Sequence, residues 1–161
     1  MPYLKWRDAQ RLAELQKKPA ADVERTSLEQ GVLPLRYARN SSAISLEEQK
    51  NLGEARVGVC GCGGLGLYVV DQLARMGVGQ VTVWDPDVFE EHNLNRQLLA
   101  NMSTLGMSKV ECARRHVEQV NPTISLTTVQ KKWQASETAF IAGHQVLVDA
   151  LDNIPVRKEL A

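Results

Sequence analysis

The chain has 161 residues, 43% of them hydrophobic and 24% charged, which suits one soluble globular domain with its own core. Lysine and arginine total 19, as do aspartate and glutamate, so bulk charge indicates neither a nucleic-acid nor a membrane partner. No apolar run has the length of a signal peptide or membrane span, and three cysteines without paired C-x-x-C motifs argue against disulfides and a zinc site. We therefore expect a cytoplasmic protein.

The first 44 residues predict a helical arm. Apolar positions among charges indicate a surface helix over residues 4–17, ended by Lys17-Lys18-Pro19, and a second helix over about 21–30. Two arginines beside a tyrosine follow, before a turn at Asn40-Ser41-Ser42. The pattern fits a dimerisation arm or a solvated extension, and slightly favours the extension.

The rest of the chain predicts an α/β domain. Ser45-Leu46-Glu47-Glu48 is a capping-box pattern, and Gly53 can close the short helix that it starts. A strand begins at Arg56 and runs into Gly61-Cys62-Gly63-Gly64-Leu65-Gly66. Apolar residues then recur at helical spacing up to a stop at Gly77.

Gly61, Gly63 and Gly66 form a G-x-G-x-x-G at this strand-to-helix junction. In such a turn one glycine allows a tight bend, one lets a phosphate approach the backbone, and one lets helix and strand pack closely. The N–H groups at the start of the helix favour an anion. A glycine-rich turn that serves packing alone is the alternative.

A second strand over Val81–Trp84 ends at Asp85-Pro86-Asp87. Strand, helix and strand within about thirty residues predict a right-handed parallel βαβ unit. Asp85 stands about twenty residues after the last glycine, where an acidic side chain accepts hydrogen bonds from ribose hydroxyls. Up to this point NAD and ATP fit equally.

The remaining elements continue the alternation. Ser108-Lys109-Val110-Glu111 is a second capping-box pattern, and its helix stops at Asn121-Pro122. Further elements are expected as a strand over 123–129, a short helix around 137–142, a strand over 146–148 and a helix starting near Pro155. The predicted fold class is α/β, with a Rossmann-like, mostly parallel sheet and flanking helices over residues 45–161. Because the chain stops inside a helix, we expect the natural protein to be longer.

Polar residues beyond the strands decide between the two nucleotides. Asn93, Arg96 and Gln97 follow the second strand, Lys109 opens a helix, and Asp152 follows the last strand. All can meet at one sheet edge, where open parallel sheets bind ligands. Arginine and lysine bind phosphate oxygens, and Mg²⁺ takes a carboxylate together with phosphate oxygens. The set suits a metal-bound triphosphate and exceeds what NAD needs.

The sequence resembles the ubiquitin-activating-enzyme-like adenylyltransferases, the HesA/MoeB/ThiF group that activates sulfur-carrier proteins. The likeness runs from Arg36 to the last residue. It rests on motifs in one order: Arg36-Tyr37-x-Arg39, Gly61-x-Gly63-Gly64-Leu65-Gly66, Asp85-x-Asp87, Asn93-Leu94-Asn95-Arg96-Gln97, Gly106-x-x-Lys109, Asn121-Pro122 and Asp152-Asn153-x-x-x-Arg157. Two departures are Asn40, where members often have Gln, and the family's second half, with its carrier-docking surface, which is absent.

The resemblance implies a role for each matching residue. Those that hold the nucleotide are Gly61, Gly63, Gly64, Gly66 and Asp85, with Asp85 at the ribose. Those at the phosphates are Asn93, Arg96, Gln97 and Lys109. Asp152 holds Mg²⁺, and Arg39 reaches the triphosphate of the partner subunit in a homodimer. The catalytic assignments are Arg96, Lys109 and Asp152.

The implied function is ATP-dependent adenylylation of the C-terminal carboxylate of a small ubiquitin-like sulfur-carrier protein, in thiamine or molybdopterin-type sulfur transfer. The alternatives are a tRNA-base carboxylate-activating dehydratase of the same superfamily, an NAD-dependent dehydrogenase, and a non-catalytic nucleotide-binding remnant. From residues 1–161 alone we expect weak ATP binding and little carrier-dependent activity.

For the three cysteines and for Asp149, the sequence predicts no chemical role. Cys62 lies beside a helix N-terminus, which can lower a thiol pKa. It occupies a variable loop position, however, and we do not expect it to be reactive. Cys60 and Cys112 are expected to be small core residues, and Asp149 a structural carboxylate at a strand end.

Overall fold

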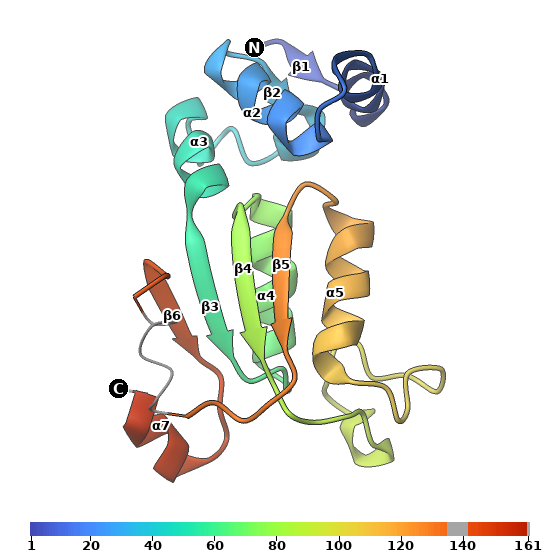
Figure 1. The fold of residues 1–161 in the computed structure, drawn as a ribbon, viewed down its shortest axis with the longest axis vertical. Helices are drawn as coiled ribbons and strands as arrows, with labels where there is room; N and C mark the ends of the chain where they lie inside the picture. Colours follow the sequence, from blue (N-terminus) through green and yellow to red (C-terminus); the bar gives the residue numbers. More distant parts are fainter. Residues whose placement is uncertain (135–141, 161) are drawn as a thin grey trace.

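A four-stranded parallel sheet forms the centre of the computed structural model, which describes residues 1–134 and 142–160 (Figure 1). The strands are β3 (Arg56–Cys60), β4 (Gln80–Trp84), β5 (Ser125–Val129) and β6 (Val146–Asp149), in the order β5-β4-β3-β6. Each coincides with a strand expected from the sequence. The predicted α/β class with a parallel sheet is therefore confirmed.

The two faces of the sheet are covered by different helices, because alternate side chains of a strand point to opposite faces. Val59 and Val83 pack with α4 (Gly66–Met76) and α5 (Lys109–Val120) in the main core. Their neighbours Cys60 and Trp84 instead join Trp133, with α7 (Ile154–Leu160) packed against them. This layering leaves the carboxyl ends of the strands free for a site.

The arm lies at the other end of the sheet, beside the amino ends of the strands (Figure 1). Its helices α1 (Trp6–Gln16) and α2 (Ala20–Glu29) match the predicted ones, and η1 (Leu35–Tyr37) follows them. The sequence did not reveal β1 (Tyr3–Leu4) and β2 (Leu33–Pro34), which pair in parallel, because two residues each carry no periodic pattern.

The two predicted capping boxes differ in outcome. Ser45 and Glu48 form a complete box at the start of α3 (Leu46–Glu54). Ser108 makes no side-chain bond at the start of α5, so this prediction was wrong. The reason is that Glu111 is held by Arg114 and Arg115 instead of reaching back to the Ser108 N–H.

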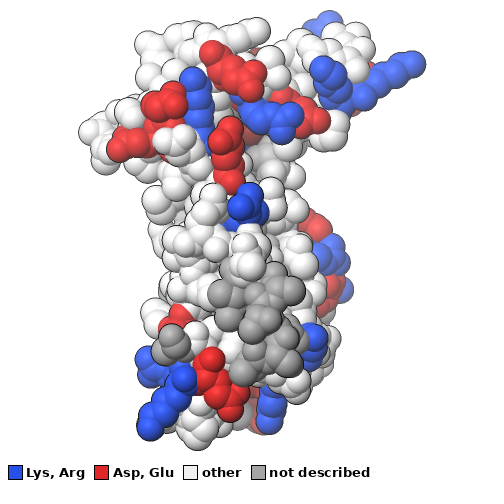
Figure 2. All heavy atoms as spheres, turned by 60° about the vertical axis from the view of Figure 1, so that its left-hand side comes forward, with Lys and Arg blue, Asp and Glu red and all other residues white. Residues whose placement is uncertain are grey.

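Two other expectations need adjustment. Gly53 lies inside α3, which continues to Glu54 and ends at Ala55, so this glycine does not close the helix. The helix expected around 137–142 lies outside the described residues, apart from residue 142. None of the described helices has the length and hydropathy needed to cross a membrane. On the face shown in Figure 2, acidic and basic side chains are interspersed over the arm.

Candidate nucleotide-binding site

A cavity of about 340 Å³ lies where the order of the sheet reverses. The chain adds β4 and then β5 on one side of β3, and then returns to place β6 on the other side. Ligands of open parallel sheets bind outside the carboxyl ends of the strands at such a switch point. The charged and polar side chains that line the cavity are Asp85, Asp87, Arg96, Gln97, Lys109, Asp149, Asp152 and Arg157.

The loop after β3 needs glycine for two separate reasons. Gly61 has φ +101°, and a Cβ there would lie 2.5 Å from the carbonyl oxygen of Ala150. A Cβ on Gly66 would overlap the carbonyl oxygen of Gly61. These two glycines therefore allow the bend and the close packing of α4, and neither lines the cavity.

Gly63 and Gly64 are different, because they line the cavity and packing does not demand them. A Cβ on Gly63 would meet no atom closer than Gln97 Nε2 at 4.0 Å, and one on Gly64 would meet the Arg96 side chain at 3.5 Å. Both are ordinary contact distances. Close approach of a ligand to the backbone explains these glycines better than packing does.

Asp85 braces the glycine loop. The carboxylate is buried at the end of β4, where Oδ2 accepts a hydrogen bond from the Cys62 N–H at 2.6 Å and Oδ1 accepts one from the Asp87 N–H at 2.8 Å. Burial raises the pKa of Asp85, and these two N–H groups oppose the rise. From the sequence, Asp85 is expected at the ribose, with capping of its own loop as the alternative; the hydrogen bond to the glycine loop could not be foreseen from the sequence.

Lys109 supplies a nearly buried positive charge at the start of α5. Its side chain is 7% exposed, and Nζ lies 3.1 Å from Oδ2 of Asp87, whose side chain is 61% exposed. The lysine backbone N–H also donates to the Asp87 carbonyl oxygen, at 3.1 Å. A phosphate that enters the cavity can therefore pair with the lysine in place of a solvated carboxylate.

The loop after β4 brings part of its motif to the cavity. Arg96 is exposed and donates to the His92 carbonyl and to Asn95 Oδ1, each at 3.0 Å. Gln97 is buried, and its Oε1 has no hydrogen-bond partner. Asn93 lies outside the cavity lining, because its buried Oδ1 accepts from the Glu90 N–H at 2.9 Å and so holds the loop. The structure does not join Asn93 to the expected cluster.

The segment after β6 completes the wall. Asp152 is exposed at the cavity, as expected for a metal ligand. Asp149 accepts from the Leu151 N–H at 3.1 Å and from Arg157 Nε at 2.7 Å. Sequence reasoning treated Asp149 as structural and gave Arg157 no role, although Arg157 stood in a quoted motif. Both residues line the cavity.

The charges of the lining fit a nucleotide together with a cation. Four carboxylates face three basic side chains, so a triphosphate alone would add negative charge to a site already negative. Within the described parts of the chain, no three or more His, Cys, Asp or Glu side chains are grouped to hold a metal ion. Asp152 is an exposed carboxylate in this lining, and Mg²⁺ commonly takes one carboxylate together with phosphate oxygens.

Two other sequence candidates lie away from this chemistry. Burial raises the pKa of the Cys62 thiol, so the helix N-terminus does not make it reactive. Arg39 follows η1, whose Tyr37 ring lies against Gly77 just before β4, at the amino ends of the strands, whereas the cavity is lined by residues at or beyond their carboxyl ends. Five residues of strand at about 3.3 Å each separate the two ends. Arg39 therefore does not contribute to the cavity of its own chain.

Residues 37–161 match the family model described as ThiF family. The chain belongs to the ThiF family. The matched region begins within η1, so α1 and α2 of the arm lie in front of it. It contains the glycine loop, Asp85, Lys109 and the whole segment after β6.

Named relatives in this family include two kinds of enzyme. The molybdopterin-synthase adenylyltransferase of Salmonella typhimurium is 41% identical over 129 residues, which are 78% of this chain and 52% of that protein. The tRNA threonylcarbamoyladenosine dehydratase of Bacillus subtilis is 33% identical over 120 residues, 73% of this chain and 47% of that protein. The chain thus spans about half the length of these relatives.

A solved structure agrees with the fold. The tRNA N6-threonylcarbamoyladenosine dehydratase of E. coli in complex with ATP has a TM-score of 0.74 and 26% identity. The alignment covers 78% of this chain and 52% of that one. A relative with this fold therefore binds ATP.

Proposed function

We propose that this chain is the nucleotide-binding part of an adenylyltransferase that transfers AMP from ATP to the C-terminal carboxylate of a small ubiquitin-like sulfur-carrier protein. The observation that carries the proposal is the cavity at the switch point. It combines an open Gly63-Gly64 backbone with the cations Arg96, Lys109 and Arg157. The relatives named molybdopterin-synthase adenylyltransferase favour a molybdopterin-type carrier over a thiamine-type one.

The reaction needs no nucleophilic side chain. An oxygen of the carrier carboxylate attacks the α-phosphorus of ATP, a new O–P bond forms, and the bond to the leaving pyrophosphate breaks. The work of the protein is to hold the two reactants in line and to stabilise the charge that develops on the phosphate oxygens. In this proposal Lys109 and Arg96 stabilise the charge on the phosphate oxygens, while Asp85 keeps the glycine loop in position.

The cofactor and assembly form part of the same proposal. Mg²⁺, when bound, would neutralise phosphate charge, and Asp152 is an exposed carboxylate of the cavity that could hold it, whereas the exposed carboxylate of Asp87 is paired with Lys109. Arg39 serves the cavity of a second copy, because it stands at the far end of the sheet from its own. Residues 45–161 then form the nucleotide-binding unit and residues 1–44 the arm of a homodimer.

A second candidate is favoured by a specific observation. Both the Bacillus relative and the E. coli structure are tRNA threonylcarbamoyladenosine dehydratases. Activation of a carboxylate on a modified tRNA base would use the same cavity, because the activated group is again a carboxylate. An NAD-dependent dehydrogenase leaves Lys109 and Asp152 without a task.

Calorimetric titration tests the proposal at its first step. We expect ATP with Mg²⁺ to bind more tightly than NAD, and Lys109→Ala to weaken ATP binding about tenfold by removing a charge-assisted contact. Lys50→Ala is the matched control, because Lys50 also pairs with a carboxylate, Glu47 at 3.3 Å, but lies in α3 away from the cavity. Tighter binding of NAD would contradict the proposal.

The substrate is tested by ATP–pyrophosphate exchange. In the full-length protein we expect exchange to depend on a ubiquitin-like carrier with a free C-terminus and to vanish when that carboxylate is amidated. Exchange that depends instead on threonylcarbamoylated tRNA would establish the dehydratase. ATP binding without exchange in the presence of either substrate would support a non-catalytic remnant.

A further inference from the structure

Two sequence motifs without an assigned role meet in one buried cluster. Arg36-Tyr37 belongs to the arm, and Asn121 follows α5, 85 residues after Arg36. Arg36 Nη1 donates to Asn121 Oδ1 at 3.0 Å, and Asn121 Nδ2 donates to the Tyr37 hydroxyl at 2.8 Å. The same amide nitrogen also donates to the Ala74 carbonyl of α4, at 2.9 Å. Arg36, Tyr37 and Asn121, here called the arm cluster, thereby tie the arm to the two core helices.

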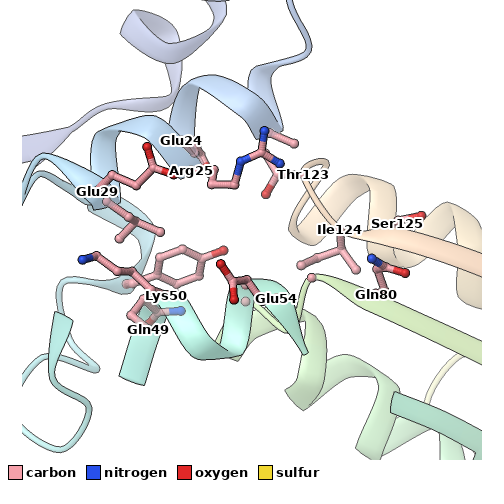
Figure 3. Close-up of a pocket in the computed structure, with 16 residues that line it drawn as sticks. Glu24, Arg25, Glu29, Gln49, Lys50, Glu54, Gln80, Thr123, Ile124 and Ser125 are labelled. Carbon is pink, nitrogen blue, oxygen red and sulfur yellow. The ribbon is translucent and has the colours of Figure 1, made fainter. Parts of the chain in front are cut away.

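The charge of Arg36 is compensated by Glu24 of α2, and its guanidinium also donates a hydrogen bond to Thr123, which lies between α5 and β5. Its Nη1 lies 2.6 Å from Glu24 Oε2 and 3.3 Å from Thr123 Oγ1, and its guanidinium carbon lies 5.1 Å from the ring centre of Trp6. Figure 3 shows Glu24 and Thr123 along the wall of a cavity of about 440 Å³ between the arm and the sheet. Removal of either partner of the largely buried Arg36–Glu24 pair would leave the other charge uncompensated, so the pair helps to hold η1 against α2.

The backbone beyond the arm cluster is fixed on both sides of Arg39. The Ala38 N–H donates to the Leu35 carbonyl at 3.1 Å, and the Asn40 N–H donates to the Tyr37 carbonyl at 2.9 Å. The Asn40 carbonyl in turn accepts from the N–H groups of Ala43 and Ile44. The Arg39 side chain is exposed and makes no hydrogen bond or ion pair with any residue that the structure describes. An unpaired guanidinium thus stands on an anchored turn.

We propose that Arg36, Tyr37 and Asn121 are positioning residues that hold the turn carrying Arg39, so that its guanidinium is presented to an anionic ligand in a second copy of this chain. This inference rests on the proposed function for the identity of the ligand. It gives the two unassigned motifs one task, which is to reduce the number of positions that Arg39 can adopt before it meets a phosphate. A preorganised cation contributes more to transition-state stabilisation than a mobile one.

Amide hydrogen exchange tests the positioning in the unmodified protein and in two variants. Tyr37→Phe removes one hydroxyl, and Arg36→Lys keeps the charge beside Glu24 but loses the forked donor. In both we expect the amides of Ala38 and Asn40 to exchange about tenfold faster, the effect of losing about one buried hydrogen bond. If Arg36→Lys does not fold, the exchange rates of Tyr37→Phe alone test whether the arm cluster holds the turn. Unchanged exchange at these amides would overturn the inference.

The matched control is His116→Ala. His116 Nε2 lies 2.8 Å from Asp71 Oδ1 and joins α5 to α4, the same two helices, without touching η1. We expect His116→Ala to lower the midpoint of thermal unfolding about as much as Tyr37→Phe does. The exchange rates of the Ala38 and Asn40 amides should stay unchanged. Faster exchange at these amides in the control would show a general loosening and would overturn the specific role.

Kinetics test whether the arm cluster acts through Arg39. In ATP–pyrophosphate exchange we expect Tyr37→Phe to lower kcat about fivefold in the natural background and to have no further effect in Arg39→Ala. An equal loss in both backgrounds would show that Tyr37 does not act through Arg39 and would overturn the proposal. If the full-length protein shows no exchange with any carrier, the proposed function fails, while the amide measurement still decides whether the arm cluster holds the turn.

Discussion

At the scale of single residues, Gly61 is the position where a substitution would disturb both the fold and the cavity. It has positive φ, and its Cα faces the backbone of the segment after β6, so both walls of the cavity depend on it. We expect Gly61→Ala to lower the free energy of unfolding by about 2–3 kcal/mol, through the strained φ and the contact with Ala150. Urea denaturation measures this loss.

The matched control for Gly61 is Gly53. A Cβ on Gly53 would meet nothing within 4 Å, and the residue lies inside α3. Gly53→Ala should therefore raise the stability by about 0.5–1 kcal/mol, because alanine has the higher helix propensity. Equal effects of the two substitutions would show that the close contact at Gly61 does not govern stability.

The site residues differ in how far the sequence could predict them. The position of Lys109 was expected from a helix start placed at the carboxyl edge of a parallel sheet, and Lys109 does line the cavity. Asn93 could not be placed, because only the three-dimensional course of its loop turns the amide toward Glu90. Arg157 was missed because an arginine in a surface helix has no pattern that separates it from ordinary surface charge.

At the scale of elements, the two capping-box patterns make opposite predictions. The Ser45 hydroxyl accepts from the Glu48 N–H at 3.2 Å, so Ser45→Ala should cost about 1 kcal/mol. The Ser108 hydroxyl is buried without a partner, so Ser108→Ala should be neutral or stabilise by up to about 1 kcal/mol. Thermal unfolding of the two variants measures the difference. Equal losses would show that Ser108 caps α5 in solution.

Long periodic elements were predictable, and short or rearranged details were not. The strand and helix around the glycine loop have a two-residue and then a 3.6-residue apolar period, which local sequence records directly. The Ser108 pattern failed because Glu111 had two arginines within one helical turn, and these outcompete a backbone N–H for its carboxylate. Competition of this kind depends on side-chain geometry, which a spacing rule does not contain.

At the scale of the whole molecule, the arm lies beside the amino ends of the sheet strands (Figure 1), whereas the residues that line the cavity come at or after the carboxyl ends of β3, β4 and β6. The cavity follows from the strand order, which reverses at β3, and that order was not deduced from the sequence. The arm cluster likewise joins residues 85 positions apart, a contact that no local pattern reveals. The expectation that Arg39 reaches the nucleotide of a second copy of the chain came from the family resemblance and not from local sequence patterns.

Subunit mixing tests that arrangement. If Arg39 acts on the cavity of its partner, a heterodimer of one Arg39→Ala subunit and one Asp152→Ala subunit has one complete site, because the unmodified cavity of the first faces the unmodified Arg39 of the second. We expect the heterodimer to recover up to about half of the natural ATP–pyrophosphate exchange, while each homodimer keeps only a small residual rate.

The control mixes Lys109→Ala with Asp152→Ala. Both residues line the cavity of their own chain, so each site in this heterodimer keeps one defect and no exchange should return. Recovery in the control would mean that the cavity itself is shared between subunits, against the single-chain lining seen here. Failure of the Arg39 mixture to recover, in a heterodimer verified by two affinity tags, would show that Arg39 does not act across the interface.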